Sequence, residues 1–147
     1  MSEGQRVFVI LVDDDPDEHF LFRADLEDAG VRFEFEAFTR PEDALAHLKS
    51  GPGRPVLIFT DLSLAGSDAV EFIRDVQPFL GGGAVGVYSG ARNPEKEAKC
   101  RDAGSSFYIV KPVTRDVFEK TVAGLGSMAL VEAEGELRLV STDSEAA

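Results

Sequence analysis

The sequence predicts an α/β domain in which a parallel sheet is covered by helices on both faces. Strand-like and helix-like segments alternate along the chain, a pattern that favours parallel strands joined by helices. Two expected strands, Val7–Val12 ("VFVILV") and Val56–Thr60 ("VLIFT"), are unbroken apolar runs, as strands buried on both faces are. Polar or charged residues follow four of the five expected strands directly, so they would gather at one edge of such a sheet.

The strands and helices are expected in strict order. Asp15 and Pro16 have the residue types of a helix cap and a first helical position, and Gly30 ends that first helix. The strand at Phe33–Phe38 ("FEFEAF") alternates between apolar and charged residues, which predicts an edge strand with one face exposed to solvent. The remaining strands are expected at Ala84–Tyr88 and Phe107–Val110, and the remaining helices at Pro41–Leu48, Ala69–Val76, Pro94–Ala103 and Thr114–Leu125.

Composition limits the classes of function. The 147 residues suit one domain, and the net charge of −12, from 27 acids and 15 bases, disfavours binding to nucleic acid. No apolar stretch approaches the ~20 residues of a membrane span, and the first residues lack the layout of a signal peptide. The single cysteine, Cys100, cannot form an internal disulfide, which fits a cytoplasmic protein.

Three carboxylates stand at the expected strand ends. Asp13 and Asp14 follow the first strand, and Asp61 follows the third. Neighbouring carboxylates repel one another and raise each other's pKa values, and a divalent cation relieves that repulsion. Because the available ligands are oxygens, without histidine or cysteine, Mg²⁺ fits this edge better than zinc.

A hydroxyl and a lysine complete the expected edge. Ser89 follows the fourth strand, and Lys111 with Pro112 follows the fifth. Together with the carboxylates they describe a site for a phosphoryl group, in which Asp61 is the nucleophile that forms an acyl phosphate. The metal and Lys111 would neutralise the phosphoryl oxygens during transfer.

The motifs "LVDDDP", "TDLSLAGSD", "YSG" and "YIVKP", in this order and each at a strand end, resemble the receiver domain of bacterial two-component response regulators. The resemblance extends from Val7 to about Leu125. It implies a flavodoxin-like, doubly wound five-stranded parallel sheet in the order 2-1-3-4-5. That order places Phe33–Phe38 at an edge, in agreement with its alternation.

The resemblance also implies a role for each site residue. Asp61 corresponds to the phosphoacceptor, and the Mg²⁺ ligands would be Asp13, Asp14, Asp61 and the backbone carbonyl of Ser63. Ser89 corresponds to the switch hydroxyl, Tyr108 to the switch aromatic residue and Lys111 to the base that pairs with the phosphoryl group. Pro112 would follow a cis peptide bond.

This sequence departs from the family pattern after the phosphoacceptor. Receivers usually carry Pro-x-x-Asp-Gly there, whereas this chain has Ala65-Gly66-Ser67-Asp68-Ala69. The change removes no reactive group, so we expect it to alter the rate of phosphorylation and not the capacity for it. Ala91, beside the site, offers no polar side chain to position a hydrolytic water.

Simpler and competing interpretations remain. Asp17 and Glu18 are explained as acidic partners of the helix N-terminus. A haloacid-dehalogenase-like phosphatase would use Asp13 as nucleophile and Asp15 as general acid, but it would leave Asp61 without a role. A degenerate receiver that acts as a constitutive interaction module is the other alternative.

The expected organisation is a receiver domain at residues 1–126 and a C-terminal extension at residues 127–147. Only 22 residues follow Leu125, too few for a helix-turn-helix output domain, so the resemblance implies a stand-alone response regulator. It would take its phosphoryl group from a histidine kinase or phosphotransfer protein and pass the signal to an unknown downstream protein. It would be a signalling phosphoacceptor and not an enzyme that acts on other substrates.

The extension is expected to form a β-hairpin. Glu134-Gly135 lies between two short runs of strand-forming residues, and a two-residue turn there places Leu130 opposite Leu139 and Glu132 opposite Leu137. An isolated hairpin is marginal in water, so this one should pack on its own domain, a second copy or a partner. We expect it near the fifth helix, with a homodimer as one arrangement and a frayed end at "STDSEAA".

Overall fold

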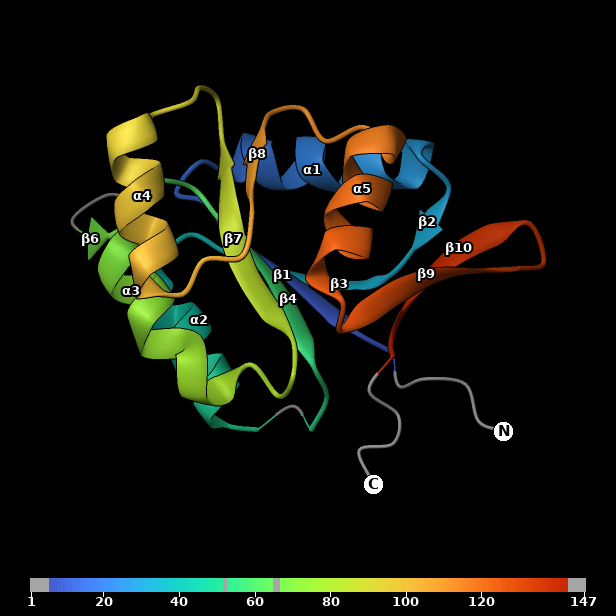
Figure 1. Ribbon diagram of the computed structural model, residues 1–147, viewed down its shortest axis with the longest axis horizontal. Coiled ribbons are helices and arrows are strands. Elements are labelled where there is room, and N and C mark those ends of the chain that lie inside the picture. The colour runs from blue at the N-terminus through green and yellow to red at the C-terminus, as the bar shows by residue number, and fades with distance from the viewer. Residues whose placement is uncertain (1–5, 52, 65–66, 143–147) are drawn as a thin grey trace.

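A five-stranded parallel sheet forms the centre of the molecule in the computed structural model, which describes residues 6–51, 53–64 and 67–142 (Figure 1). The strand order is β3-β1-β4-β7-β8, which confirms the expected order 2-1-3-4-5. The strands are β1 (Phe8–Val12), β3 (Glu34–Phe38), β4 (Val56–Thr60), β7 (Ala84–Ser89) and β8 (Tyr108–Val110).

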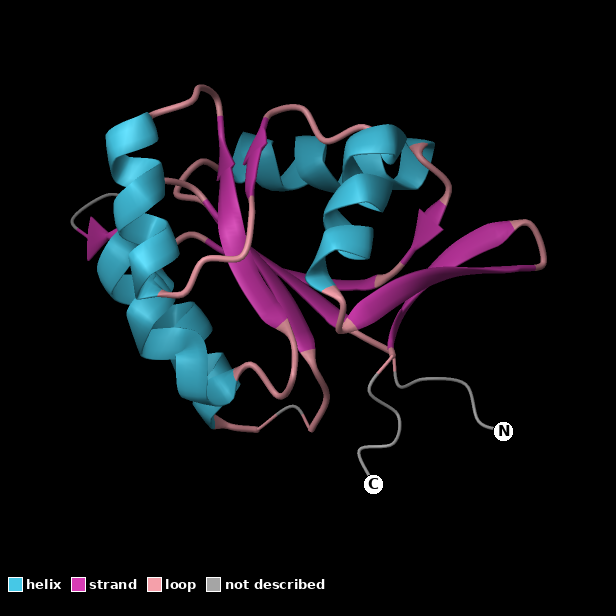
Figure 2. Ribbon diagram, in the orientation of Figure 1, coloured by secondary structure: helices cyan, strands magenta, loops and turns pink. Residues whose placement is uncertain are grey.

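Helices cover both faces of this sheet (Figure 2). On one face lie α1 (Pro16–Asp28) and α5 (Arg115–Leu125), and on the other lie α2 (Pro41–Lys49), α3 (Ala69–Val76) and α4 (Pro94–Ala103). A short 3-10 helix, η1 (Gln77–Phe79), continues α3. The start of α1 is fixed as expected: the Asp15 side chain accepts a hydrogen bond from the Asp17 N–H, and Pro16 is the first helical residue.

The hydrophobic core consists of two clusters separated by the sheet. In β1, Val9 and Leu11 belong to the cluster under α1 and α5, while Ile10 and Val12 belong to the cluster under α2, α3 and α4. Both faces of β1 and β4 are therefore buried, which accounts for their unbroken apolar sequences. At the edge, β3 exposes its alternate residues Glu34 and Glu36, as its pattern predicted.

A second, three-stranded sheet lies beside the first. It has the order β2-β10-β9 and consists of β2 (Val31–Arg32), β9 (Met128–Ala133) and β10 (Glu136–Ser141). The two later strands form the hairpin in the expected register, with Leu130 opposite Leu139 and Glu132 opposite Leu137. The end of the extension, residues 143–147, lies outside the described residues.

The hairpin packs on its own domain. Met128, Leu137 and Leu139 are buried in the same cluster as the inward faces of α1 and α5, and β9 contacts α5. The parallel pairing of β10 with β2 is not predicted by the sequence, because a strand of two residues is too short to show an alternation of apolar and polar residues. None of the helices in the described residues combines the length and the apolar character needed to cross a bilayer.

Candidate functional site

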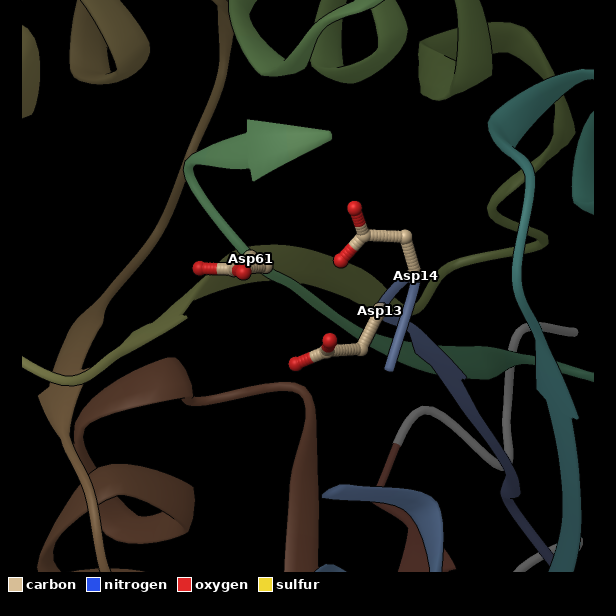
Figure 3. Close-up of side chains that lie close together, drawn as sticks. All are labelled: Asp13, Asp14 and Asp61. Carbon is tan, nitrogen blue, oxygen red and sulfur yellow. The ribbon is translucent and has the colours of Figure 1, made fainter. Parts of the chain in front are cut away.

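Three carboxylates meet at the carboxyl end of the central strands (Figure 3). Strands β1 and β4 pair in register through Val12 and Thr60, and the Asp61 N–H donates to the Val12 carbonyl at 3.0 Å. The residues that follow each strand therefore leave the sheet side by side. One carboxylate oxygen from each of Asp13, Asp14 and Asp61 lies within 4.8 Å of the other two.

The three carboxylates differ in burial. Asp13 is only 1% exposed, Asp61 is half-buried and Asp14 is exposed. Burial raises the pKa of Asp61, and the charge of Asp13 raises it further, while Lys111 and the N–H groups of Leu62 and Ser63 lower it in part. The ionised form of Asp61 is therefore destabilised by its surroundings, and a cation among these oxygens would stabilise it. The donor set, all oxygen, fits Mg²⁺.

Lys111 lies at this site but is held by two other carboxylates. Its Nζ is 3.0 Å from Asp13 Oδ2 and 3.1 Å from Glu18 Oε1. Burial alone would lower the pKa of Lys111, but hydrogen bonds to Asp13 and Glu18 raise it above its usual value. Among the ion pairs of the described residues, Asp61 is not a partner of Lys111 within 4.0 Å.

The first turn of α1 contributes more to the site than its sequence indicates. Glu18 is expected from the sequence only as an acidic partner of the helix N-terminus, whereas in the structure it also pairs with Lys111. His19, one residue later, places Nε2 at 2.7 Å from the Asp13 carbonyl oxygen. The signal available in the sequence was position: only three residues separate β1 from α1, so the first turn of α1 lies near the carboxyl end of the sheet.

The remaining candidate residues come from the neighbouring strands β7 and β8 and from the segment that follows β8. Ser89 is the buried last residue of β7, and the Lys111 N–H donates to its carbonyl at 2.8 Å. Tyr108 is half-buried in β8; its hydroxyl donates to the Ala91 carbonyl at 2.6 Å, and the Arg92 guanidinium lies 5.2 Å from its ring centroid. The peptide bond between Lys111 and Pro112 is cis.

Two short antiparallel strands follow Asp61, where no strand was expected from the sequence. Ser63, exposed, begins β5 (Ser63–Leu64), which pairs with β6 (Ser67–Asp68), and the Asp68 side chain caps α3 by accepting from the Val70 N–H. Ala65 and Gly66, part of the departure from the family pattern, lie outside the described residues.

Comparison with known proteins establishes the family. The family model of the response regulator receiver domain matches residues 9–123. The chain belongs to this receiver family. The KDP operon transcriptional regulatory protein KdpE of Escherichia coli K12 is 31% identical over 105 residues, which cover 71% of this chain and 44% of that protein. The chain therefore spans less than half the length of this curated relative.

Solved structures share the fold. A CheY-like receiver domain from Methanospirillum hungatei JF-1 superposes with a TM-score of 0.68 at 24% identity, over 83% of this chain and 95% of that one. A two-component response regulator from Cytophaga hutchinsonii superposes with a TM-score of 0.70 at 22% identity, over 82% of this chain and 97% of that one. The phosphatase alternative is not supported, because the chain is a receiver and Asp15, its candidate general acid, caps α1.

Proposed function

We propose that this receiver accepts one phosphoryl group on Asp61 from a histidine kinase or phosphotransfer protein, with Mg²⁺ as cofactor. One observation carries the proposal: the half-buried carboxylate of Asp61 lies with Asp13 and Asp14 at one strand edge. Lys111 reaches the same edge through its ion pair with Asp13. This arrangement combines a nucleophile, oxygen ligands for a cation, and a positively charged lysine that can pair with phosphoryl oxygens.

The transfer exchanges one bond to phosphorus for another. A carboxylate oxygen of Asp61 forms a bond to phosphorus while the phosphorus–nitrogen bond of the donor phosphohistidine breaks. The imidazole nitrogen leaves with the electron pair of that bond, and the product on Asp61 is an acyl phosphate. The Leu62 N–H, which donates to Asp61 Oδ1 at 2.8 Å, fixes the direction of the nucleophile.

The metal ligands we propose are the side chains of Asp13, Asp14 and Asp61 and the backbone carbonyl of Ser63. When bound, Mg²⁺ supplies positive charge that neutralises phosphoryl oxygens and offsets the repulsion among the carboxylates. Asp13 is held for this role by its surroundings: it accepts from the Asp15 N–H at 3.0 Å and pairs with Lys111.

The signal leaves the site through Ser89 and Tyr108. We propose that a phosphoryl group on Asp61 draws the Ser89 hydroxyl toward it, which frees space for the Tyr108 ring to turn inward. Tyr108 must then give up its hydrogen bond to Ala91 and its contact with Arg92. The surface of α4, β8 and α5 would change as a result and bind a downstream protein.

The net charge of −12 favours a protein partner over nucleic acid. We place the protein in the cytoplasm, where kinases that use ATP act and a free thiol such as Cys100 stays reduced. A homodimer is not required to cover the hairpin, because Leu137 and Leu139 are already buried within the domain.

Phosphorylation by acetyl phosphate tests the proposal. With Mg²⁺, the intact mass of the wild-type chain should rise by one phosphoryl group, labile to base, and Asp61→Asn should abolish the gain. Asp75→Asn, at an exposed position of α3, is the matched control and should label like the wild type. A wild-type chain that is never labelled would support a degenerate receiver instead.

A further inference from the structure

Lys111 forms ion pairs with both Asp13 and Glu18, and the proposed function gives no role to the pair with Glu18. A lysine that serves the phosphoryl group on Asp61 must direct at least one of its three N–H donors toward that group. In this structure its ion-pair contacts go to Asp13 and Glu18. These two contacts leave one donor for a phosphoryl group, so a second N–H can be donated to that group only if one of the contacts lengthens or breaks.

The pair with Asp13 is the less able to change. Asp13 is fixed by the backbone: its Oδ1 accepts from the Asp15 N–H, and its own N–H donates to the Phe38 carbonyl at 3.0 Å. The Lys111 Nζ also lies 5.4 Å from the centroid of the buried Tyr88 ring, a cation–π contact. The contacts with Asp13 and Tyr88 are therefore the ones that we expect Lys111 to keep.

The pair with Glu18 is the one that can open. Glu18 lies in the first turn of α1, and its side chain is 28% exposed, against 18% for Lys111. Lys111 is its one ion-pair partner in the described part of the chain. An opened Glu18 carboxylate reaches water, whereas an opened Asp13 carboxylate would stay buried.

We propose that Glu18 is a competing partner that holds Lys111 in the unphosphorylated protein and opposes phosphorylation of Asp61. This inference rests on the proposed function of Asp61. The phosphoryl group and Glu18 compete for the N–H donors of Lys111, so the Glu18 contact favours the unphosphorylated state. Glu18 is a positioning residue, since it acts through Lys111 and contacts no reacting atom.

Two effects of Glu18 must be separated. Its charge repels any anion that approaches the site, and its contact restrains Lys111. Asp17 supplies the matched control, because it is an acid of the same helical turn without an ion pair in the described residues, and Asp17→Asn removes the same charge. The difference between Glu18→Gln and Asp17→Asn then measures the contact.

The experiment measures the affinity for beryllofluoride, which stands in for the phosphoryl group, by NMR titration of the full chain with Mg²⁺. Relative to Asp17→Asn, Glu18→Gln should bind beryllofluoride about fivefold more tightly, the effect of one partly exposed ion pair. The Mg²⁺ affinities of the two variants should match, because neither residue is a proposed ligand. Melting curves verify that both variants are folded.

The outcomes separate the two proposals. If the wild type binds beryllofluoride and Asp61→Asn does not, while Glu18→Gln binds no more tightly than Asp17→Asn, the role of Glu18 is refuted and that of Asp61 stands. Weaker binding by Glu18→Gln would show that Glu18 assists Lys111, which also overturns the inference. If the wild type does not bind beryllofluoride at all, the proposed function itself fails.

Discussion

Replacement of Leu139 by alanine should destabilise the receiver although Leu139 lies beyond the segment that the family model matches. The side chain is 3% exposed and belongs to the cluster formed with α1 and α5. A buried leucine shortened to alanine loses about 2–5 kcal/mol of unfolding free energy. Its strand is also attached by its backbone, since the Val7 N–H donates to the Leu139 carbonyl at 3.1 Å. We therefore expect the free energy of unfolding to fall by ~3 kcal/mol, or roughly 10 °C in Tm.

Urea unfolding followed by circular dichroism measures this loss, with thermal melts as a second measure. Val131→Ala is the control in the same hairpin, because Val131 is 47% exposed and its truncation should cost less than about 1 kcal/mol. A Leu139→Ala variant that unfolds at the same urea concentration as Val131→Ala would refute the inclusion of the hairpin in the core. A cooperative loss in a single transition would support it.

Three further predictions concern the site. Mg²⁺ should raise the Tm of the wild type by mass action, and Asp14→Ala should remove most of that rise while leaving the fold intact. Because burial and Asp13 raise the pKa of Asp61, its charge destabilises the fold as pH rises through that raised pKa. Asp61→Asn should therefore raise Tm in Mg²⁺-free buffer at neutral pH, with the gain lost in acid below the ordinary pKa. Beryllofluoride should shift amide signals of α4, β8 and α5 as Tyr108 leaves Ala91, and shifts confined to the strand ends would contradict the switch.

Much of the fold was predictable because each signal was local and strong. The strand Val56–Thr60 and the helices Ala69–Val76 and Pro94–Ala103 begin and end where the sequence indicated. Apolar runs, proline at the first helical turn and glycine at the ends fix such bounds through short-range physics. The edge position of Glu34–Phe38 followed from its alternation and agrees with the family order.

The sequence predicted that the three aspartates lie close together, but it did not predict the ion pair between Lys111 and Glu18. A parallel sheet brings all strand ends to one edge, so the approach of Asp13 and Asp61 followed from topology alone. The choice of Glu18 as the second partner of Lys111 depends on where the first turn of α1 points. The pairing of Val31–Arg32 with β10 joins residues about a hundred positions apart through a strand too short to show a pattern.

The central claim is that Asp61 carries the phosphoryl group, and localisation of the modification tests it most directly. The wild-type chain is treated with acetyl phosphate and Mg²⁺, and borohydride then reduces the acyl phosphate to a stable homoserine residue. Peptide mass spectrometry should place homoserine at position 61, at a yield that depends on Mg²⁺, and Asp61→Asn should show none. Homoserine at Asp13 or Asp14, or equal labelling of the Asp61→Asn variant, would contradict the account.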